Sequence, residues 1–322
     1  MGERTGIEWT DSTWNPIRAR NLATGKIGWH CEHVSEGCRN CYAESINLRL
    51  GTGLPFKPGH RGDYGIVLDE KMLLYPLRWK KPRRVFVNSM SDTFAEFVKD
   101  EWIDRMFAVM ALCPDHTFQV LTKRPERMLD YMSANNFMKI AGFLPVTTRW
   151  IANAVEIDKQ RLIANRGETF PLPNVWLGTS AEDQAAADER IPLLLQTPAA
   201  VRFVSLEPLL GPIKLADAIM PWVFDELRRR IINDKQPNPR DGKLDWVIVG
   251  GESGPNARPM HPEWARDIRD QCAAAGLPYF FKQWGAFSYV DAIGVPSIVP
   301  RRVGKHTAGR LLDGIEHNGM PS

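Results

Sequence analysis

Three of the five cysteines lie close together in the sequence, at Cys31, Cys38 and Cys41. Six residues separate the first two cysteines, and two residues separate the last two. Three thiolates can hold three irons of a four-iron cluster and leave the fourth iron open to a small molecule. The spacing therefore fits a [4Fe-4S] cluster with one open position, which is a reactive centre rather than an electron carrier.

The same stretch also fits a zinc site. His30 and His33 flank Cys31, and one imidazole with three thiolates makes a closed tetrahedral zinc site. Spacing alone leaves both metals open, and the zinc alternative is a non-catalytic protein that binds nucleic acid or another protein. The other two cysteines, Cys113 and Cys272, fall in segments with helical character, where we expect buried side chains without a ligand role.

A second set of polar residues follows six short segments that are mostly apolar and of strand length. These segments are 85–89, 117–122, 174–179, 201–206, 245–250 and 278–283, with a weaker seventh candidate at 6–10. Segments that are apolar on both faces are typical of buried parallel strands. Between them, 100–112, 181–195 and 261–275 have apolar residues at helical spacing. Strands that alternate with helices predict an α/β fold with a parallel sheet.

The carboxyl ends of parallel strands meet at one edge of a sheet, where α/β proteins bind their ligands. The polar residues at the six predicted strand ends are Asp92, Lys123, Ser180, Glu207, Glu252 and Lys282. We therefore expect these side chains around one mouth. The segment 250–254 is rich in glycine but has neither the Walker ending nor the dinucleotide spacing, so it predicts a tight functional turn.

Composition narrows the class of protein. The 322 residues are 43% hydrophobic and 25% charged, which argues against a disordered chain, a collagen or a coiled coil. No apolar run reaches the roughly 18 residues of a membrane span, and no apolar signal region is seen, so we expect a cytoplasmic protein with no membrane partner. We expect one domain over 1–285 with insertions at about 133–170 and 217–243, followed by a C-terminal extension over 286–322.

The net charge of +3 permits a nucleic-acid partner without requiring one. Basic residues cluster at 80–84, 228–230 and 301–305, and the eleven tryptophans include candidates for stacking on bases. A nucleic acid is therefore one candidate substrate, and its binding should weaken steeply with salt.

Several motifs resemble the phage-associated three-Cys-motif proteins, the DUF5131 family, over roughly residues 6–316. These motifs are Trp14-Asn15-Pro16, Gly37-Cys38-Arg39-Asn40-Cys41-Tyr42-Ala43-Glu44, Ser91-Asp92, Leu121-Thr122-Lys123-Arg124-Pro125, Ser205-Leu206-Glu207-Pro208-Leu209-Leu210, Phe281-Lys282-Gln283-Trp284-Gly285 and Leu311-Leu312-Asp313-Gly314. That family is similar to the spore photoproduct lyase branch of the radical S-adenosylmethionine (SAM) enzymes. The resemblance implies a partial (β/α)6, TIM-like barrel with helical and loop insertions and the cluster in the loop after the first strand.

The resemblance also implies the cofactor chemistry and its residues. SAM would bind the open iron, and one electron would cleave it to methionine and a 5′-deoxyadenosyl radical that takes a hydrogen from the substrate. Carried over by position, Tyr42 would lie beside SAM, Ser91 and Asp92 would meet its amine, and Lys123 and Ser180 would meet its carboxylate or ribose. Glu207 and Glu252 are left as substrate or ribose contacts. The implied partners are the substrate, an electron donor and a partner protein.

Two features depart from the radical SAM pattern. The separation of Cys31 from Cys38 is wider than usual, and 19–29 has the character of an insertion before the first cysteine. The Gly-Gly-Glu tripeptide that commonly binds the SAM amine follows a late strand here, at 250–252, so Glu252 does not inherit that role.

Overall fold

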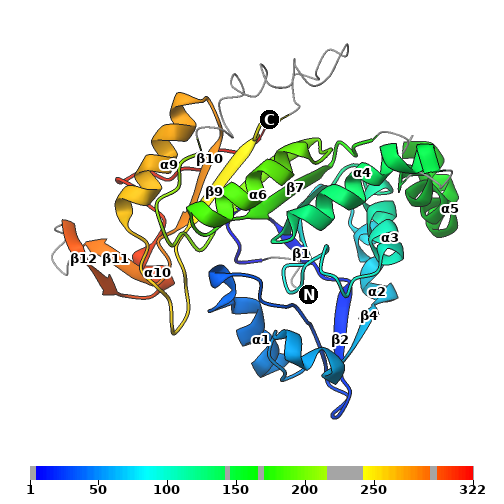
Figure 1. Ribbon diagram of the computed structural model, residues 1–322, viewed down its shortest axis with the longest axis horizontal. Coiled ribbons are helices and arrows are strands. Elements are labelled where there is room, and N and C mark those ends of the chain that lie inside the picture. The colour runs from blue at the N-terminus through cyan, green and yellow to red at the C-terminus, as the bar shows by residue number, and fades with distance from the viewer. Residues whose placement is uncertain (1–4, 142–145, 166–169, 216–241, 291–295, 322) are drawn as a thin grey trace. The chain divides into compact units, whose positions relative to one another are not determined.

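The computed structural model describes residues 5–141, 146–165, 170–215, 242–290 and 296–321 (Figure 1). The chain divides into two compact units, the first formed by 1–178 and 197–200 and the second by 179–196 and 201–322. Seven strands belong to one parallel sheet, in the order β1-β5-β6-β7-β8-β9-β10. Strand β7 (Val175–Ser180) is where the chain passes from the first unit to the second.

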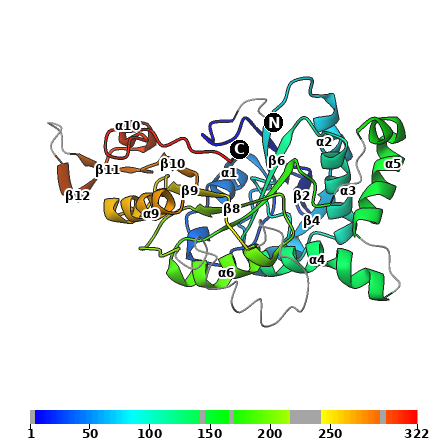
Figure 2. The ribbon, with the colours of Figure 1, turned by 90° about the horizontal axis from the view of Figure 1, so that it is seen from above.

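The first unit contains parallel strands with helices between them. Strand β5 (Arg84–Val87) pairs in parallel with β1 (Ser12–Trp14) and with β6 (Thr117–Thr122). Helix α3 (Asp100–Ala111) connects β5 to β6, and α4 (Pro125–Ala141) follows β6. Helix α5 (Val146–Asn165) lies beside α3 in both views (Figures 1 and 2).

The expected apolar stripe of α3 is confirmed. Ile103, Met106, Phe107 and Met110 are all fully buried, because residues spaced three and four apart share one face of a helix. The helix begins with Asp100 and Glu101, whose negative charges favour the positive end of the helix dipole.

The chain segment that connects β1 to β5 contains a small antiparallel sheet, which was not expected from the sequence. Strand β2 (Ile17–Asn21) pairs with β3 (Ile27–Gly28) on one side and with β4 (Tyr64–Leu68) on the other. The insertion expected at 19–29 is largely the β2–β3 hairpin. The chain then forms short elements before β5: η1 (Glu36–Cys38), α1 (Tyr42–Leu50), η2 (Pro58–Asp63), α2 (Glu70–Leu73) and η3 (Tyr75–Arg78).

The second unit has its own strands and helices. Strand β9 (Trp246–Gly250) is buried along its whole length and pairs in parallel with β8 (Val201–Leu206) and β10 (Tyr279–Gln283). The helices are α6 (Gln184–Gln196), α9 (Pro262–Ala274) and α10 (Lys305–Ala308). Strands β11 (Phe287–Val290) and β12 (Pro296–Arg302) form an antiparallel hairpin within the expected C-terminal extension.

The mixed α/β class with a parallel sheet is confirmed, and each of the six predicted strands is present within two residues. The seventh, weaker strand prediction at 6–10 is wrong in place, because the Thr10 N–H bonds the carbonyl of Ile7 in a turn and β1 begins at Ser12. The insertion expected at 133–170 contains parts of α4 and α5, and most of 217–243 lies outside the described residues. No helix in the described ranges is long and apolar enough to span a membrane.

Candidate metal centre

The three clustered cysteines lie on a short stretch of the first unit. Cys31 follows β3, Cys38 ends η1, and Cys41 immediately precedes α1. The Cys41 N–H bonds the carbonyl of Cys38 at 3.2 Å, so these two cysteines share one turn. All three are half-buried and none forms a disulfide.

The three thiols lie within electrostatic range of one another. Cys31 and Cys41 both pack against the apolar cluster of Ala43, Phe56 and Met90. Burial, together with the charges of Asp92 and of the other two thiols, raises the pKa of the Cys31 thiol to about 12. A metal removes this penalty by replacing the proton, because the thiolate is the metal-binding form.

In the part of the chain that the structure describes, no three His, Cys, Asp or Glu side chains come together tightly enough to hold one metal ion. In an iron–sulfur cluster each thiolate binds a different iron, so the three sulfur atoms need to be near one another without sharing one ion.

The two histidines of the zinc alternative have other neighbours. His33 Nε2 is 3.0 Å from a carboxylate oxygen of Glu44, whose other oxygen accepts the N–H of Phe56 at 2.8 Å. His30 is 1% exposed and its ring lies 4.1 Å from that of Tyr64, with Nε2 3.5 Å from the Glu32 carboxylate. Each imidazole therefore lies beside a carboxylate.

The loop that follows β5, residues 88–92, holds both ends of the cysteine stretch. The Ser91 hydroxyl donates to the carbonyl of His30 at 2.7 Å, directly before Cys31. The Tyr42 hydroxyl, directly after Cys41, donates to the carbonyl of Ser89 at 2.6 Å. Asn88 starts the loop with φ of 51°, a left-handed conformation that asparagine tolerates better than most residues.

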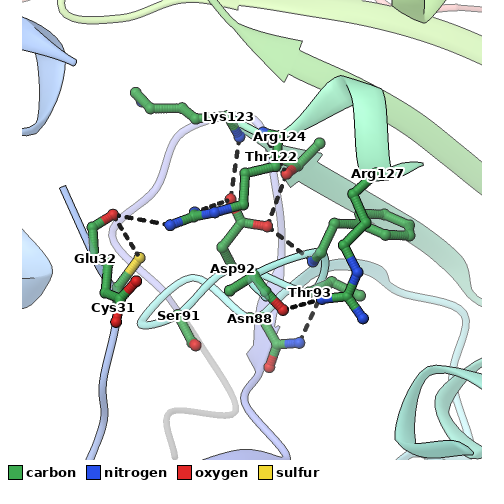
Figure 3. Close-up of polar contacts among 12 residues, drawn as sticks. Cys31, Glu32, Asn88, Ser91, Asp92, Thr93, Thr122, Lys123, Arg124 and Arg127 are labelled. Atoms are coloured by element: carbon green, nitrogen blue, oxygen red, sulfur yellow. Dashed lines mark hydrogen bonds and ion pairs between the residues drawn. The ribbon is translucent and has the colours of Figure 1, made fainter. Parts of the chain in front are cut away.

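Asp92 is the most heavily bonded side chain of this loop (Figure 3). One oxygen accepts the hydroxyl of Thr122 at 2.7 Å and the N–H of Phe94 at 2.9 Å. The other accepts the backbone N–H of Lys123 and Nη1 of Arg124, both at 3.1 Å. The structure thus gives Asp92 four donors of its own, and its contact with the SAM amine stays a prediction.

Two arginines that sequence reasoning missed hold the residue next to Cys31. Arg61 donates twice to the Glu32 carboxylate, at 2.6 and 2.7 Å, and Nη2 of Arg124 donates to the Glu32 carbonyl at 3.1 Å. Burial alone would lower the pKa of Arg124, but the charges of Asp92 and Cys31 outweigh burial and raise it. The one sequence signal for Arg124 was its place beside Lys123 at the end of a predicted strand.

The remaining predicted site residues lie in the second unit. Lys282 Nζ is 3.1 Å from the Glu207 carboxylate, which also accepts the hydroxyl of Ser205 at 3.1 Å. Glu252 forms a separate pair with Arg258, at 2.7 and 2.9 Å. Ser180 is buried at the end of β7. Glu207 and Lys282 are thus brought together, and the expected single mouth for all six strand ends stays a prediction.

The glycine pair that ends β9 has a packing explanation. A Cβ atom at Gly250 would overlap the carboxylate of Glu207, and one at Gly251 would overlap the backbone of Trp284. The turn predicted at 250–254 therefore needs small residues to let neighbouring groups approach.

We expect Gly250→Ala to push Glu207 away from Lys282 and to cost about 1–3 kcal/mol of stability, as overpacking usually does. Glu207→Ala in the same chain should restore most of that loss, because it removes the overlapping atoms. Gly251→Ala should be costly in either background, since its obstacle is backbone. Urea unfolding of the single and double variants measures this, and a Gly250→Ala loss that Glu207→Ala does not relieve would contradict the explanation.

The basic clusters are partly used within the protein. Arg84 pairs with Asp11 at 3.0 Å, and the Arg83 guanidinium lies over the ring of Trp79. Arg302 lies over the ring of Phe287, and the cluster at 228–230 is outside the described residues. Nucleic-acid binding therefore stays a prediction.

The fold and the site together define a mixed α/β protein with a three-cysteine candidate metal centre beside the carboxyl ends of β5 and β6. The chain belongs to the DUF5131 family, since the family model described as "Protein of unknown function (DUF5131)" matches residues 4–321. The family resemblance of the motifs is thereby confirmed. No curated protein and no solved structure matches the chain.

Proposed function

We propose that this protein is a radical SAM-like enzyme whose Cys31, Cys38 and Cys41 hold a [4Fe-4S] cluster. The observation that carries the proposal is that Cys31 and Cys41 pack against the apolar cluster that contains Met90 of the loop 88–92, and this loop also bonds residues next to both cysteines. Cys38 is near enough for its charge to act on both of these thiols. When bound, the cluster and SAM supply reductive cleavage of SAM and a radical that takes hydrogen from a substrate.

The surroundings of Cys41 include groups that stabilise its thiolate. Cys41 immediately precedes the first turn of α1, a position that favours negative charge. Burial raises the pKa of Cys41, whereas the backbone N–H groups of Glu44 and Ala43 act in the opposite direction. These N–H groups would help to hold the negative charge once a metal has displaced the proton.

Lys123 and Tyr42 of the same unit support the proposed SAM site. The ammonium of Lys123 is near enough to Cys41 to lower the pKa of that thiol, and a cationic side chain there suits the SAM carboxylate. Tyr42 is next to Cys41 and is 48% exposed, so its ring is available to lie against a ligand. Ser180 would contact the SAM carboxylate or ribose, and Glu207 and Glu252 would contact the substrate or the ribose.

We also propose the finer architecture, a partial (β/α)6 barrel. Its support is the parallel pairing of β5 with β6 and of β9 with both β8 and β10, with the cysteines between β1 and β5 in the sequence. The antiparallel β2–β3 hairpin accounts for the insertion at 19–29 before the first cysteine.

The test is anaerobic reconstitution with iron and sulfide, followed by reduction with dithionite in the presence of SAM. We expect a brown protein with about four irons per chain, and 5′-deoxyadenosine that appears only after reduction. Unreduced protein with SAM is the matched control. A colourless protein that takes up one zinc and leaves SAM intact would contradict the proposal. That result would favour the alternative of a non-catalytic protein with a structural zinc site.

A further inference from the structure

The position of Cys31 cannot come from the turn that joins Cys38 and Cys41, because six residues intervene. Its flanking residues are held from outside instead. Ser91 bonds the carbonyl of His30, and Arg124 bonds the carbonyl of Glu32. The residues on both sides of Cys31 are therefore fixed by hydrogen bonds to their carbonyl groups.

Arg124 spans from this stretch to Asp92. Its Nη1 donates to Asp92 and its Nη2 to the Glu32 carbonyl, both at 3.1 Å (Figure 3). The Cys31 Sγ lies 3.8 Å from that same carbonyl oxygen, so sulfur and guanidinium share one acceptor. The side chains of Arg124 and Asp92 are only 13% and 7% exposed, so solvent screens their charges little.

Two opposite charges therefore act on Cys31: the charge of Asp92 disfavours its thiolate and the charge of Arg124 favours it. Asp92 alone would repel a thiolate, and Arg124 offsets that repulsion. A cluster becomes more negative when it accepts an electron, so a nearby cation favours the reduced form and a nearby anion opposes it.

We propose that Arg124 is a positioning residue for Cys31 that also raises the reduction potential of the cluster by neutralising Asp92. This inference rests on the proposed function, because it needs the cluster. It assigns Asp92 and Arg124 to a charge balance beside the first cysteine ligand.

The experiment is an electron-paramagnetic-resonance redox titration of the reconstituted full chain, with iron per chain measured on each sample. We expect R124M to shift the midpoint potential to a more negative value, because it removes a cation and leaves Asp92 unpaired. D92N should shift the potential in the opposite direction. The double variant R124M/D92N should return toward the wild-type value, and R124K should lie between R124M and wild type.

R127M is the matched control. Arg127 lies in the first turn of α4, three residues after Arg124, but bonds the carbonyl of Val98 and the carboxylate of Asp100. We expect wild-type potential and iron content from R127M.

Equal potentials in wild type, R124M and D92N would overturn the inference while normal iron loading leaves the proposed function standing. A shift in R127M as large as that in R124M would overturn it as well. A wild-type protein that loads no iron contradicts the proposed function first. If R124M does not fold, the opposite shifts expected of R124K and D92N still decide the question.

Discussion

Alanine at Cys31, Cys38 or Cys41 is expected to abolish cluster loading, while alanine at Cys113 or Cys272 leaves it at the wild-type level. Each of the three clustered thiolates binds a different iron in the proposed centre, so two remaining ligands cannot hold the cluster. Cys113 and Cys272 are 6% and 0% exposed, and they follow α3 and lie within α9 respectively.

The measurement is iron and acid-labile sulfide per chain after anaerobic reconstitution, with the visible absorption of the cluster beside it. The control variants lose one buried sulfur atom each and should cost about 1 kcal/mol of stability, a typical value for one substitution. A clustered-cysteine variant that keeps its iron would show that another ligand holds the metal. Loss of iron in both controls would show that the site is elsewhere.

Asp92→Asn is expected to destabilise the protein by about 3–5 kcal/mol, because it leaves the Arg124 charge buried without its partner. Asparagine also replaces one carboxylate oxygen by an NH2 group. That NH2 group would face two of the hydrogen-bond donors that now bond the Asp92 carboxylate. Both side chains of the Arg124–Asp92 pair are largely buried. When one partner is removed, the desolvation cost of the remaining charge is no longer offset.

Asp100→Asn is the matched control for this prediction. The Arg127–Asp100 pair is 2.9 Å long, close to the 3.1 Å of Arg124–Asp92, but the Asp100 side chain is 59% exposed. Exposed ion pairs contribute about 0–1 kcal/mol, so we expect a small effect. Urea unfolding of the two variants compares them directly, and similar losses would mean that burial does not set the strength of the Asp92 network.

The sequence determined much of the fold through local patterns. The six strands and the α3, α6 and α9 helices follow from apolar runs and helical periodicity, which depend on neighbours within a few residues. The strands β2 and β3 were missed because they carry little such signal; β3, for example, is two residues long. Strand β4 is a mostly apolar run of five residues, so the same pattern could have identified it. The strand predicted at 6–10 was wrong for a related reason. Its five residues carry a pattern that depends only on near neighbours and that does not distinguish a strand from a turn.

The sequence by itself also identified the cysteine stretch and the polar residues at the strand ends, because residue type and spacing are written in the chain. The hydrogen-bond partners of these residues depend on the tertiary structure. Asp92 could be named as a charge at a strand end, but its bonds to Thr122 and Arg124 depend on β5 and β6 being neighbours. Arg61 and Arg124 reach Glu32 across 29 and 92 residues of sequence. Such contacts carry no local pattern, because they arise when distant segments pack together and buried charges must each find a partner.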